Sequence, residues 1–413
     1  MLVDAIRICI LSKADSFGGG ASKCAEDLSV QLDHAGHKVR HYCYWSGKGY
    51  NTLRYPMIGR GRKPVSFFRE KFEKRVFGLP EFLPIELPFL LKKGILDYDI
   101  LHFHDICSAI SPLTVFHLAK AKPVVWTFHD CSAFTGGCLY PMACEKYQTV
   151  CSRCDQKEWP IDSPSTHTAL LQRIKKHIFS KTNMTLLAPS QWMANMASGA
   201  SVLNRKPLVI NNGVDTDLFQ AIEKKSARRA LSIPEHRYVI LISAASFGDE
   251  RKGFAYAVQS ISAISDLKPY ILVMGKVDAK RIHTELGNVD IRLFGYQCDP
   301  NIINTIYAAA DVFLFPSLAD NQPLSILESF ASGTPVIAFD TGGIPEMIEP
   351  ASGTIVKQKQ IEGLVGELRR FSDKTVSTAM SISARRLAKK KFGMKLFVDN
   401  HIHLYQKILA AAK

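Results

Sequence analysis

No long apolar segment occurs in this sequence. Its 413 residues contain no uninterrupted run of about 18 apolar residues, the length that a transmembrane helix needs. The first residues, MLVDAIRICILS, carry Asp4 and Arg7 inside their apolar run and lack a small-residue cleavage pattern. They predict a first strand rather than a signal peptide. We therefore expect a cytoplasmic protein without a membrane-spanning helix.

Several signature motifs are also missing. The G-x-G-x-x-G fingerprint does not occur where it would be expected, which argues against a nicotinamide cofactor. No recognition motif accompanies the basic residues, so nucleic-acid binding is not expected. No repeat or low-complexity tract is apparent.

Composition and length point to two folded domains. Hydrophobic residues make up 46% and charged residues 22%, the balance of a folded soluble protein. A chain of 413 residues is long for one hydrophobic core.

Apolar, β-branched runs alternate with helical patterns, which predicts parallel sheets covered by helices. We expect a domain over residues 1–206, a second over 207–393, and a final helix over 394–413. The expected buried face of that helix comprises Leu396, Phe397, Ile402, Leu404, Tyr405 and Ile408. The predicted strands are residues 6–11, 38–44, 100–103, 124–128, 186–189 and 208–210, then 238–243, 270–274, 291–294, 312–315 and 336–339.

The stretch DNQPLSILESFASGTPVIA, residues 320–338, predicts a ligand-binding turn. Pro323 suits the first turn of a helix, which follows a strand and stops at Gly333. At such a helix start, the free N–H groups of Leu324 and Ser325 would face an anion such as a diphosphate. Asp320 and Glu328 would accept hydrogen bonds from the hydroxyl groups of sugar rings. The alternative is that Asp320 only caps the helix and that Glu328 is solvated.

This stretch resembles the signature of the retaining glycosyltransferases of family four. In it, a first acid is followed by seven residues, a second acid and then G-T-P-V. Asp320 with Asn321, in place of the usual first Glu, looks like the exopolysaccharide and colanic-acid branch. The resemblance implies the α/β GT-B fold, in which two doubly wound Rossmann-like domains face a cleft and the C-terminal helix returns to the N-terminal domain.

The resemblance also implies roles for other motifs. SFGGGASK would place Gly19 and Gly20 at donor phosphate or acceptor, and WTFHD would place His129, beside Asp130, near the donor sugar. His104 in LHFHD is a weaker candidate. Lys252 in SFGDERKGF matches the lysine that neutralises the leaving diphosphate, with Arg251 as a second charge because the usual earlier arginine is absent. The expected donor-binding set is Gly19, Gly20, Arg251, Lys252, Asn321, Gln322, Pro323, Leu324, Ser325 and Glu328, and the expected catalytic set is His129, Asp130, Lys252 and Asp320.

Four of the ten cysteines lie close together, in the spacing C-x5-C-x6-C-x2-C over residues 138–154. In a reducing compartment this spacing favours a closed, structural zinc site over free thiols or disulfides. The four ligands would be Cys138, Cys144, Cys151 and Cys154.

The net charge of +14 is concentrated in residues 54–76 and 385–413. The first stretch interleaves its basic residues with Phe67, Phe68 and Phe72, a composition suited to anionic lipid headgroups, although a solvated basic helix has the same pattern. We expect peripheral attachment to the inner face of the cytoplasmic membrane.

Together these features predict a retaining hexosyltransferase with no catalytic metal. The donor would be a UDP- or GDP-sugar, and the acceptor a lipid-linked saccharide in bacterial exopolysaccharide, capsule or O-antigen synthesis. A GT-B sugar-nucleotide epimerase and a non-catalytic saccharide-binding protein are the alternatives.

Overall fold

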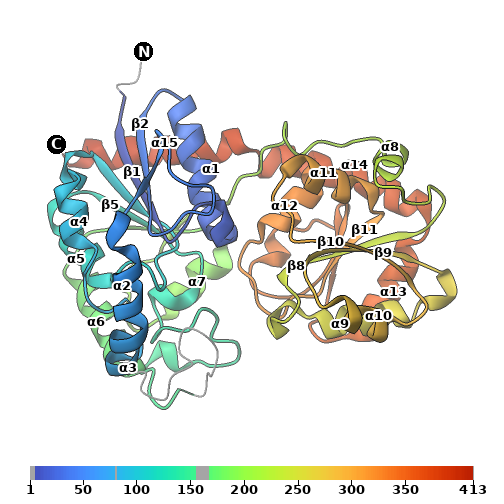
Figure 1. Cartoon of the computed structure of the whole chain (residues 1–413), viewed down its shortest axis with the longest axis horizontal. Coiled ribbons are helices and arrows are strands. Elements are labelled where there is room, and N and C mark those ends of the chain that lie inside the picture. The colour runs from blue at the N-terminus through green and yellow to red at the C-terminus, as the bar shows by residue number, and fades with distance from the viewer. Residues whose placement is uncertain (1–4, 80, 155–166, 413) are drawn as a thin grey trace. The chain divides into compact units, whose positions relative to one another are not determined.

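The computed structural model describes residues 5–79, 81–154 and 167–412 (Figure 1). The chain divides into two compact units. Unit 1 comprises Met1–Asn211 together with Val398–Lys413, and unit 2 comprises Asn212–Phe397. The sequence places the boundary a few residues earlier, at 206/207.

Unit 1 is built on a sheet whose neighbouring strands all run parallel. Within the described residues the sheet has seven strands in the order β3-β2-β1-β4-β5-β6-β7. The order runs outward in both directions from the β1/β4 pair, in which Ile8 lies opposite Ile100. The strands are β1 Arg7–Ser12, β2 Lys38–Cys43, β3 Arg54–Pro56, β4 Ile100–Phe103, β5 Val124–Thr127, β6 Thr185–Ala188 and β7 Leu208–Val209.

Unit 2 repeats this plan with a six-stranded parallel sheet, counted over the described part of the chain, in the order β10-β9-β8-β11-β12-β13. Here the order reverses at the β8/β11 pair, in which Phe313 lies opposite Leu241. The strands are β8 Val239–Ser246, β9 Tyr270–Lys276, β10 Asp290–Gly295, β11 Val312–Phe315, β12 Val336–Phe339 and β13 Gly353–Val356.

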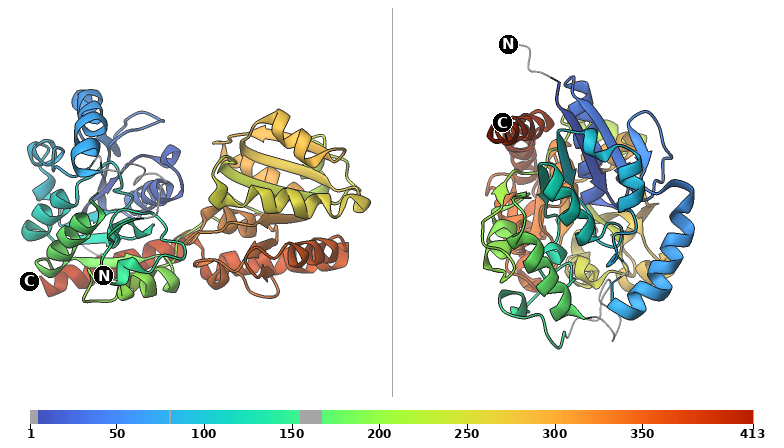
Figure 2. Two further views of the ribbon diagram at one scale, coloured as in Figure 1. Left: turned by 90° about the horizontal axis from the view of Figure 1, so that it is seen from below. Right: turned by 90° about the vertical axis from the view of Figure 1, so that its left-hand side faces the viewer.

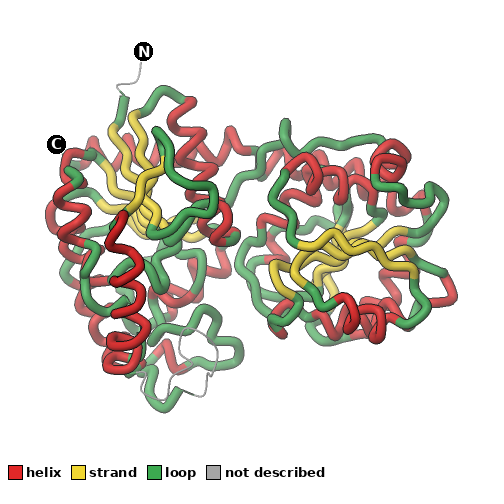
Figure 3. The backbone as a smooth tube through the Cα atoms, in the orientation of Figure 1, coloured by secondary structure: helices red, strands yellow, loops and turns green. Residues whose placement is uncertain are grey.

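Helices cover the sheets, and in each unit the strands form the central layer (Figure 3). In unit 1 the helices are α1 Gly20–His34, α2 Arg62–Phe68, α3 Lys74–Phe77, α4 Leu87–Lys92, α5 Pro112–Ala121, α6 Thr168–Ser180 and α7 Gln191–Gly199. In unit 2 they are α8 Lys224–Ala230, α9 Phe254–Ser262, α10 Ala279–Leu286, α11 Pro300–Ala309, α12 Leu324–Ala331, α13 Ile361–Phe371 and α14 Lys374–Lys391.

Strand β11 shows why these apolar runs become central strands. Its residues alternate between two hydrophobic clusters: Phe313 and Phe315 pack with Phe330 of α12, while Leu314 packs with Leu364 of α13. A strand that is covered on both faces has no polar position, so its sequence is continuously apolar.

Two strands were not predicted. β3 has only three residues, includes a proline and lies at the sheet edge, so it lacks an apolar run. β13 begins at Gly353, where a Cβ atom would lie 2.3 Å from the carbonyl oxygen of Val336. The glycine that lowers strand propensity is therefore what lets the two strands approach.

Helix α15, Met394–Ala411, begins in unit 2 and ends in unit 1, and Figure 2 shows it from two further directions. Its C-terminal part packs on unit 1, where Tyr405 Oη lies 2.7 Å from Nδ1 of His102 on β4. One expected member of its buried face is wrong: Leu396 is 44% exposed. No helix in the described ranges is long and apolar enough to cross a membrane.

Candidate active site

In unit 2, two loops meet where the strand order reverses. The loop after β8 contains a short 3-10 turn, Glu250–Lys252, and the loop after β11 contains Asp320. The Lys252 ammonium nitrogen lies 2.7 Å from Oδ2 of Asp320. Ligands of open parallel sheets bind at such a reversal, beyond the carboxyl ends of the strands. This pair therefore marks the centre of the candidate site in unit 2.

Arg251 holds the two loops together. Its Nη1 donates to the carbonyl oxygen of Ala319 at 2.6 Å, and its own carbonyl accepts the N–H of Leu318 at 2.7 Å. Its Nη1 also lies 3.7 Å from Oδ2 of Asp320. The two neighbouring cations predicted from the sequence thus converge on one carboxylate.

Asp320 remains a carboxylate in this setting. Burial alone would raise its pKa, but the charges of Lys252 and Arg251 and hydrogen bonds from Lys252 and Ser317 bring the pKa below the ordinary value. The Ser317 hydroxyl donates to Oδ2 at 3.0 Å. The arrangement combines positive charge with one fixed hydrogen-bond acceptor, as a phosphate-bearing sugar requires.

Two glycines permit this close packing. Gly253 has a φ of +70°, and a Cβ atom there would lie 1.8 Å from the carbonyl oxygen of Pro316. Gly342, in the turn after β12, has a φ of +60°, and its Cβ would lie 1.7 Å from the carbonyl oxygen of Asp320. Any side chain at either position would displace the loop that carries Asp320.

The start of α12 borders the same loop. Pro323 immediately precedes the helix in an extended conformation, rather than within the first turn as predicted. The first amides of a helix have no intrahelical acceptor, and Leu324 and Ser325, which supply them here, are half-buried. Glu328, on the second turn, is also half-buried. A helix start of this kind favours an anionic ligand.

Gln322 is fixed by hydrogen bonds to Asn212, and its side-chain amide nitrogen is unused. Its Oε1 accepts the N–H of Asn212 at 2.5 Å, and its carbonyl oxygen accepts Nδ2 of Asn212 at 3.1 Å. Its buried Nε2 has no hydrogen-bond partner within the described residues. Asn321 beside it is buried as well. An unpaired buried donor is costly, so a ligand oxygen at this point would satisfy it.

In unit 1 the glycine loop follows β1. Gly19 has a φ of +101° and directly precedes α1, which begins at Gly20. A Cβ atom on Gly19 would meet nothing within 4 Å. Its conformation, rather than crowding, accounts for the glycine, and the first turn of α1 lies beside an open surface.

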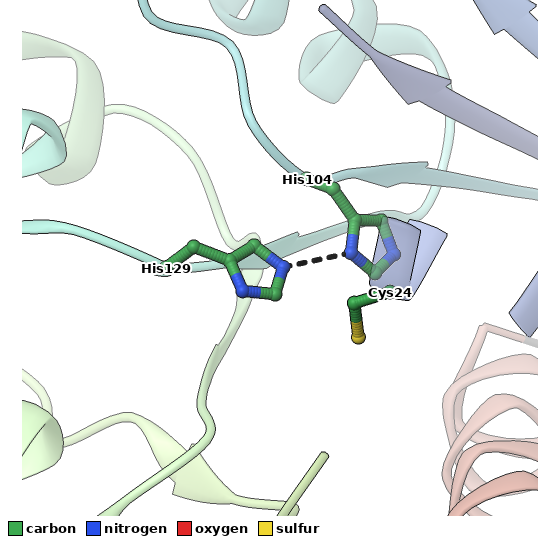
Figure 4. A group of neighbouring side chains, drawn as sticks. All are labelled: Cys24, His104 and His129. Atoms are coloured by element: carbon green, nitrogen blue, oxygen red, sulfur yellow. Dashed lines mark hydrogen bonds between the residues drawn. The ribbon is translucent and has the colours of Figure 1, made fainter. Parts of the chain in front are cut away.

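The ends of β4 and β5 bring His104 and His129 together. Nδ1 of His104 lies 3.0 Å from Nε2 of His129, and the two imidazoles face each other beside the sulfur of Cys24 (Figure 4). The ligand atoms of Cys24, His104 and His129 all lie within 4.8 Å of one another, and no other group of three or more His, Cys, Asp or Glu in the described chain meets that criterion. His104, the weaker candidate from sequence, is thus the direct neighbour of His129.

These histidines are neutral at pH 7. Burial, then the nearby His401, lowers the pKa of His129 to about 4. Burial likewise lowers the pKa values of His102 and His104 well below the ordinary range. A neutral imidazole can accept or donate one hydrogen bond at a sugar hydroxyl without adding charge.

Asp130 has a local structural task. Its Oδ1 accepts the N–H of Ser132 at 2.7 Å and caps the short 3-10 turn Cys131–Ala133. Burial raises the pKa of its carboxyl group. This cap fixes the Asp130 carboxylate in the loop that follows His129.

Sequence reasoning missed Cys24, His102 and Tyr405. Cys24 lies one turn into the helix after the glycine loop, and no motif distinguishes it there. His102 lies on β4 and His104 directly follows that strand, so their spacing of two could have drawn attention to His102. Tyr405 was expected only as part of an apolar face, because its contact with His102 joins residues at opposite ends of the chain.

Family models match both units. A Glycosyltransferase Family 4 model matches residues 18–218, and a model described as Glycosyl transferases group 1 matches residues 237–374. The chain belongs to these glycosyltransferases, as its sequence motifs predict. Solved glycosyltransferases share its architecture over nearly the whole length, so the predicted GT-B fold is confirmed.

Particular relatives narrow the comparison. The chain is 23% identical to the putative colanic acid biosynthesis glycosyl transferase WcaC of Escherichia coli, over 94% of this chain and 97% of that protein. It is 23% identical to the MMP alpha-(1->4)-mannosyltransferase of Mycolicibacterium hassiacum, over 98% and 99%. The structure of Anabaena Alr3699/HepE in complex with UDP and glucose aligns with a TM-score of 0.68 at 15% identity, over 97% of this chain and all of that one.

Proposed function

We propose that this glycosyltransferase moves a hexose from a UDP- or GDP-sugar to a hydroxyl group of a lipid-linked saccharide, with retention of the anomeric configuration. The main support is the meeting of Lys252, Arg251 and Asp320 at the strand-order reversal of unit 2, beside the start of α12. Positive groups and open helix amides suit a diphosphate, and fixed carboxylates suit sugar hydroxyls.

The proposed chemistry depends on charge and positioning. Lys252 and Arg251 stabilise the departing diphosphate together with the first amides of α12, so the transfer needs no catalytic metal. Glu328 holds the ribose, and Asp320 holds the transferred sugar. Retention favours attack on the face that the diphosphate leaves, with the departing phosphate accepting the proton of the attacking hydroxyl, because no strong base is then required. In unit 1, neutral His129, which lies beside His104, can accept a hydrogen bond from a sugar hydroxyl.

Donor binding is the direct test. In a thermal-shift panel of UDP-, GDP- and ADP-sugars, a true donor binds only the folded protein and raises its melting temperature. We expect a shift with a UDP- or GDP-sugar that is lost in Lys252→Ala. No shift with any nucleotide-sugar would contradict the proposal.

The acceptor class is inferred from the relatives and from a surface of unit 1. The name of the Escherichia coli relative refers to colanic acid, an exopolysaccharide, which supports a role in exopolysaccharide, capsule or O-antigen synthesis. Such saccharides grow on lipid carriers at the inner face of the cytoplasmic membrane. A catalyst of this reaction therefore benefits from contact with that surface.

Residues 62–77 form the surface in question, which we call the aromatic-basic helix. It comprises α2, one π-helical turn over Arg69–Glu73, and α3. On its exposed side Phe67 is 66% and Phe72 is 49% exposed. The exposed cations Lys63, Lys71 and Arg75 lie among them.

The inner side of this helix is fixed to unit 1. Buried Arg69 forms ion pairs with Glu86 and, at 3.4 Å, with Glu73, and it donates to the carbonyl oxygen of Ala109 at 2.7 Å. The exposed phenylalanines are therefore presented on an anchored element. Aromatic rings among cations match an anionic lipid surface, in which rings enter the interface and ammonium groups meet phosphates.

Vesicle sedimentation tests this surface. We expect the protein to sediment with vesicles of phosphatidylglycerol at low salt, and Phe67→Glu with Lys71→Glu to abolish binding. Ile382 of α14, which is 61% exposed in unit 2, provides the matched control as Ile382→Glu. Equal loss in the control, or no sedimentation of the wild type, would contradict the membrane proposal.

Two other functions make distinct predictions. An epimerase would convert a nucleotide-sugar with no acceptor present, so product analysis with the donor alone separates it from a transferase. A saccharide-binding protein would keep its ligand affinity after loss of charge at Lys252 and Asp320.

A further inference from the structure

The loop after His129 brings four cysteines around one small cavity. Cys138, Cys144, Cys151 and Cys154 all line it, together with Tyr147 and Thr168 among others. The cavity has a volume of about 20 Å³, which is room for one water-sized atom. We propose that this cavity binds one structural Zn²⁺ through the four thiolates. This site is separate from the proposed sugar transfer and does not depend on it.

The donor set fits zinc in type and number. Four thiolates form the closed tetrahedral shell of structural zinc sites and leave no position for a reacting water. Cys138, Cys144, Cys151 and Cys154 are all free thiols in the structure, so none of the four is committed to a disulfide. The spacing also allows each pair, Cys138 with Cys144 and Cys151 with Cys154, to come from one turn of the loop.

One ligand is already oriented as a metal-bound sulfur would be. Sγ of Cys151 accepts the backbone N–H of Gly136 at 3.3 Å, a contact that stabilises a thiolate and fixes its direction. The Cys151 backbone is held in turn, because its N–H donates to Oε1 of Gln172 on α6 at 2.7 Å. The buried ammonium group of Lys175 donates to the carbonyl oxygens of Ser132 and Thr135 and fastens the start of the loop.

Zinc binding requires the sulfurs of this loop to move closer together. In the described part of the chain, only Cys24, His104 and His129 form a group of three whose ligand atoms all lie within 4.8 Å of one another. No three of the four loop sulfurs are therefore that close together. Sulfurs that share a tetrahedral zinc at about 2.3 Å lie about 3.8 Å apart. Cys154 is exposed, whereas Cys151 is buried. Zinc binding should therefore draw Cys154 inward and protect it from reagents.

Alkylation of the intact chain tests this protection directly. Cys298, the other exposed cysteine, provides the internal control. In zinc-loaded protein we expect iodoacetamide to modify Cys298 but not Cys154. After treatment with a zinc chelator we expect it to modify both cysteines. Equal modification of the two before chelation would overturn the proposal. Modification of Cys154 only after reduction would show a disulfide instead, and would also overturn it.

Metal analysis gives an independent measure. We expect about one zinc per purified chain, and removal of the metal to lower the melting temperature by at least about 4 °C. Cys151→Ser should lose the metal, whereas Cys298→Ser should retain it. Less than about half an equivalent of zinc in the wild type would refute the site. Because alkylation and metal content are measured on the wild-type chain, the test holds even where a variant fails to fold.

Discussion

At the scale of single residues, the proposed reaction depends most on the charge of Lys252. Its ammonium group lies 2.7 Å from Asp320, and the proposed reaction needs the same charge on the leaving diphosphate. Lys252→Ala should therefore lower kcat by about a hundredfold, the usual cost of removing one group that stabilises developing charge. Steady-state kinetics with the donor found by thermal shift measures this loss.

The matched control for that substitution is Lys225→Ala, at an exposed position of α8. It should leave kcat unchanged. A Lys252→Ala enzyme with the wild-type rate would show that the diphosphate is stabilised elsewhere.

Three histidines near the ends of β4 and β5 predict how stability depends on pH. The folded protein holds His102, His104 and His129 neutral, with the pKa of His129 lowered to about 4, whereas an unfolded histidine titrates near 6.5. Above pH 6.5 both states are neutral at these positions, and the full stability is present. As the pH falls from about 6.5 to about 4, the unfolded chain gains protons first at these positions, so the contribution of these histidines to the free energy of unfolding decreases.

Urea unfolding at pH 7.5 and pH 5.0 measures this decrease. Replacing His104 by Gln should reduce the difference between the two pH values. If the difference between the two pH values is the same in His104→Gln as in the wild type, the assignment of a neutral, buried imidazole at this position is wrong.

At the scale of elements, glycine turns hold the loop that carries Asp320. Gly253→Ala should lower the free energy of unfolding by about 1–3 kcal/mol, because a side chain at φ +70° is strained and its Cβ would overlap the Pro316 carbonyl. The same substitution should weaken donor binding, since Lys252 is the adjacent residue. Urea unfolding and the thermal-shift panel measure the two effects.

Gly366 in the exposed face of α13 provides the control. A Cβ atom there meets nothing within 4 Å, and Gly366→Ala should stabilise the protein by about 0.5–1 kcal/mol. If both substitutions behave alike, the close approach at Gly253 has no energetic consequence.

Much of the fold could be predicted at this scale. Central strands such as β11 are continuously apolar because helices cover both faces, and that pattern is visible in the sequence. The short edge strand β3 has no apolar run, so it could not be predicted in this way. The turn between β11 and α12 was predictable from the spacing of Asp320, Pro323 and Gly333. The pairing of Lys252 with Asp320 was not, because it depends on which strands are neighbours in the sheet.

At the scale of the whole molecule, α15 joins the last residues of the chain to unit 1. Tyr405→Phe would leave Nδ1 of buried His102 without its partner, which should cost about 1–3 kcal/mol in the stability of unit 1. The tryptophans at positions 45, 126, 159 and 192 all precede residue 212, so tryptophan fluorescence follows unit 1 selectively. The fluorescence transition in urea should shift to lower concentration.

Leu396→Ala, at an exposed position of the same helix, should shift that transition by less than about 0.5 kcal/mol. An unshifted transition in Tyr405→Phe would mean that the helix contributes nothing to unit 1 through this contact.

The return of α15 also determines the order in which the chain can mature. Unit 2 is one continuous segment, whereas unit 1 includes Val398–Lys413. Domains fold as they emerge from the ribosome, with the earlier segment usually first. The nascent first unit therefore remains incomplete, and its His102 side uncovered, until the residues from Val398 onward have been synthesised.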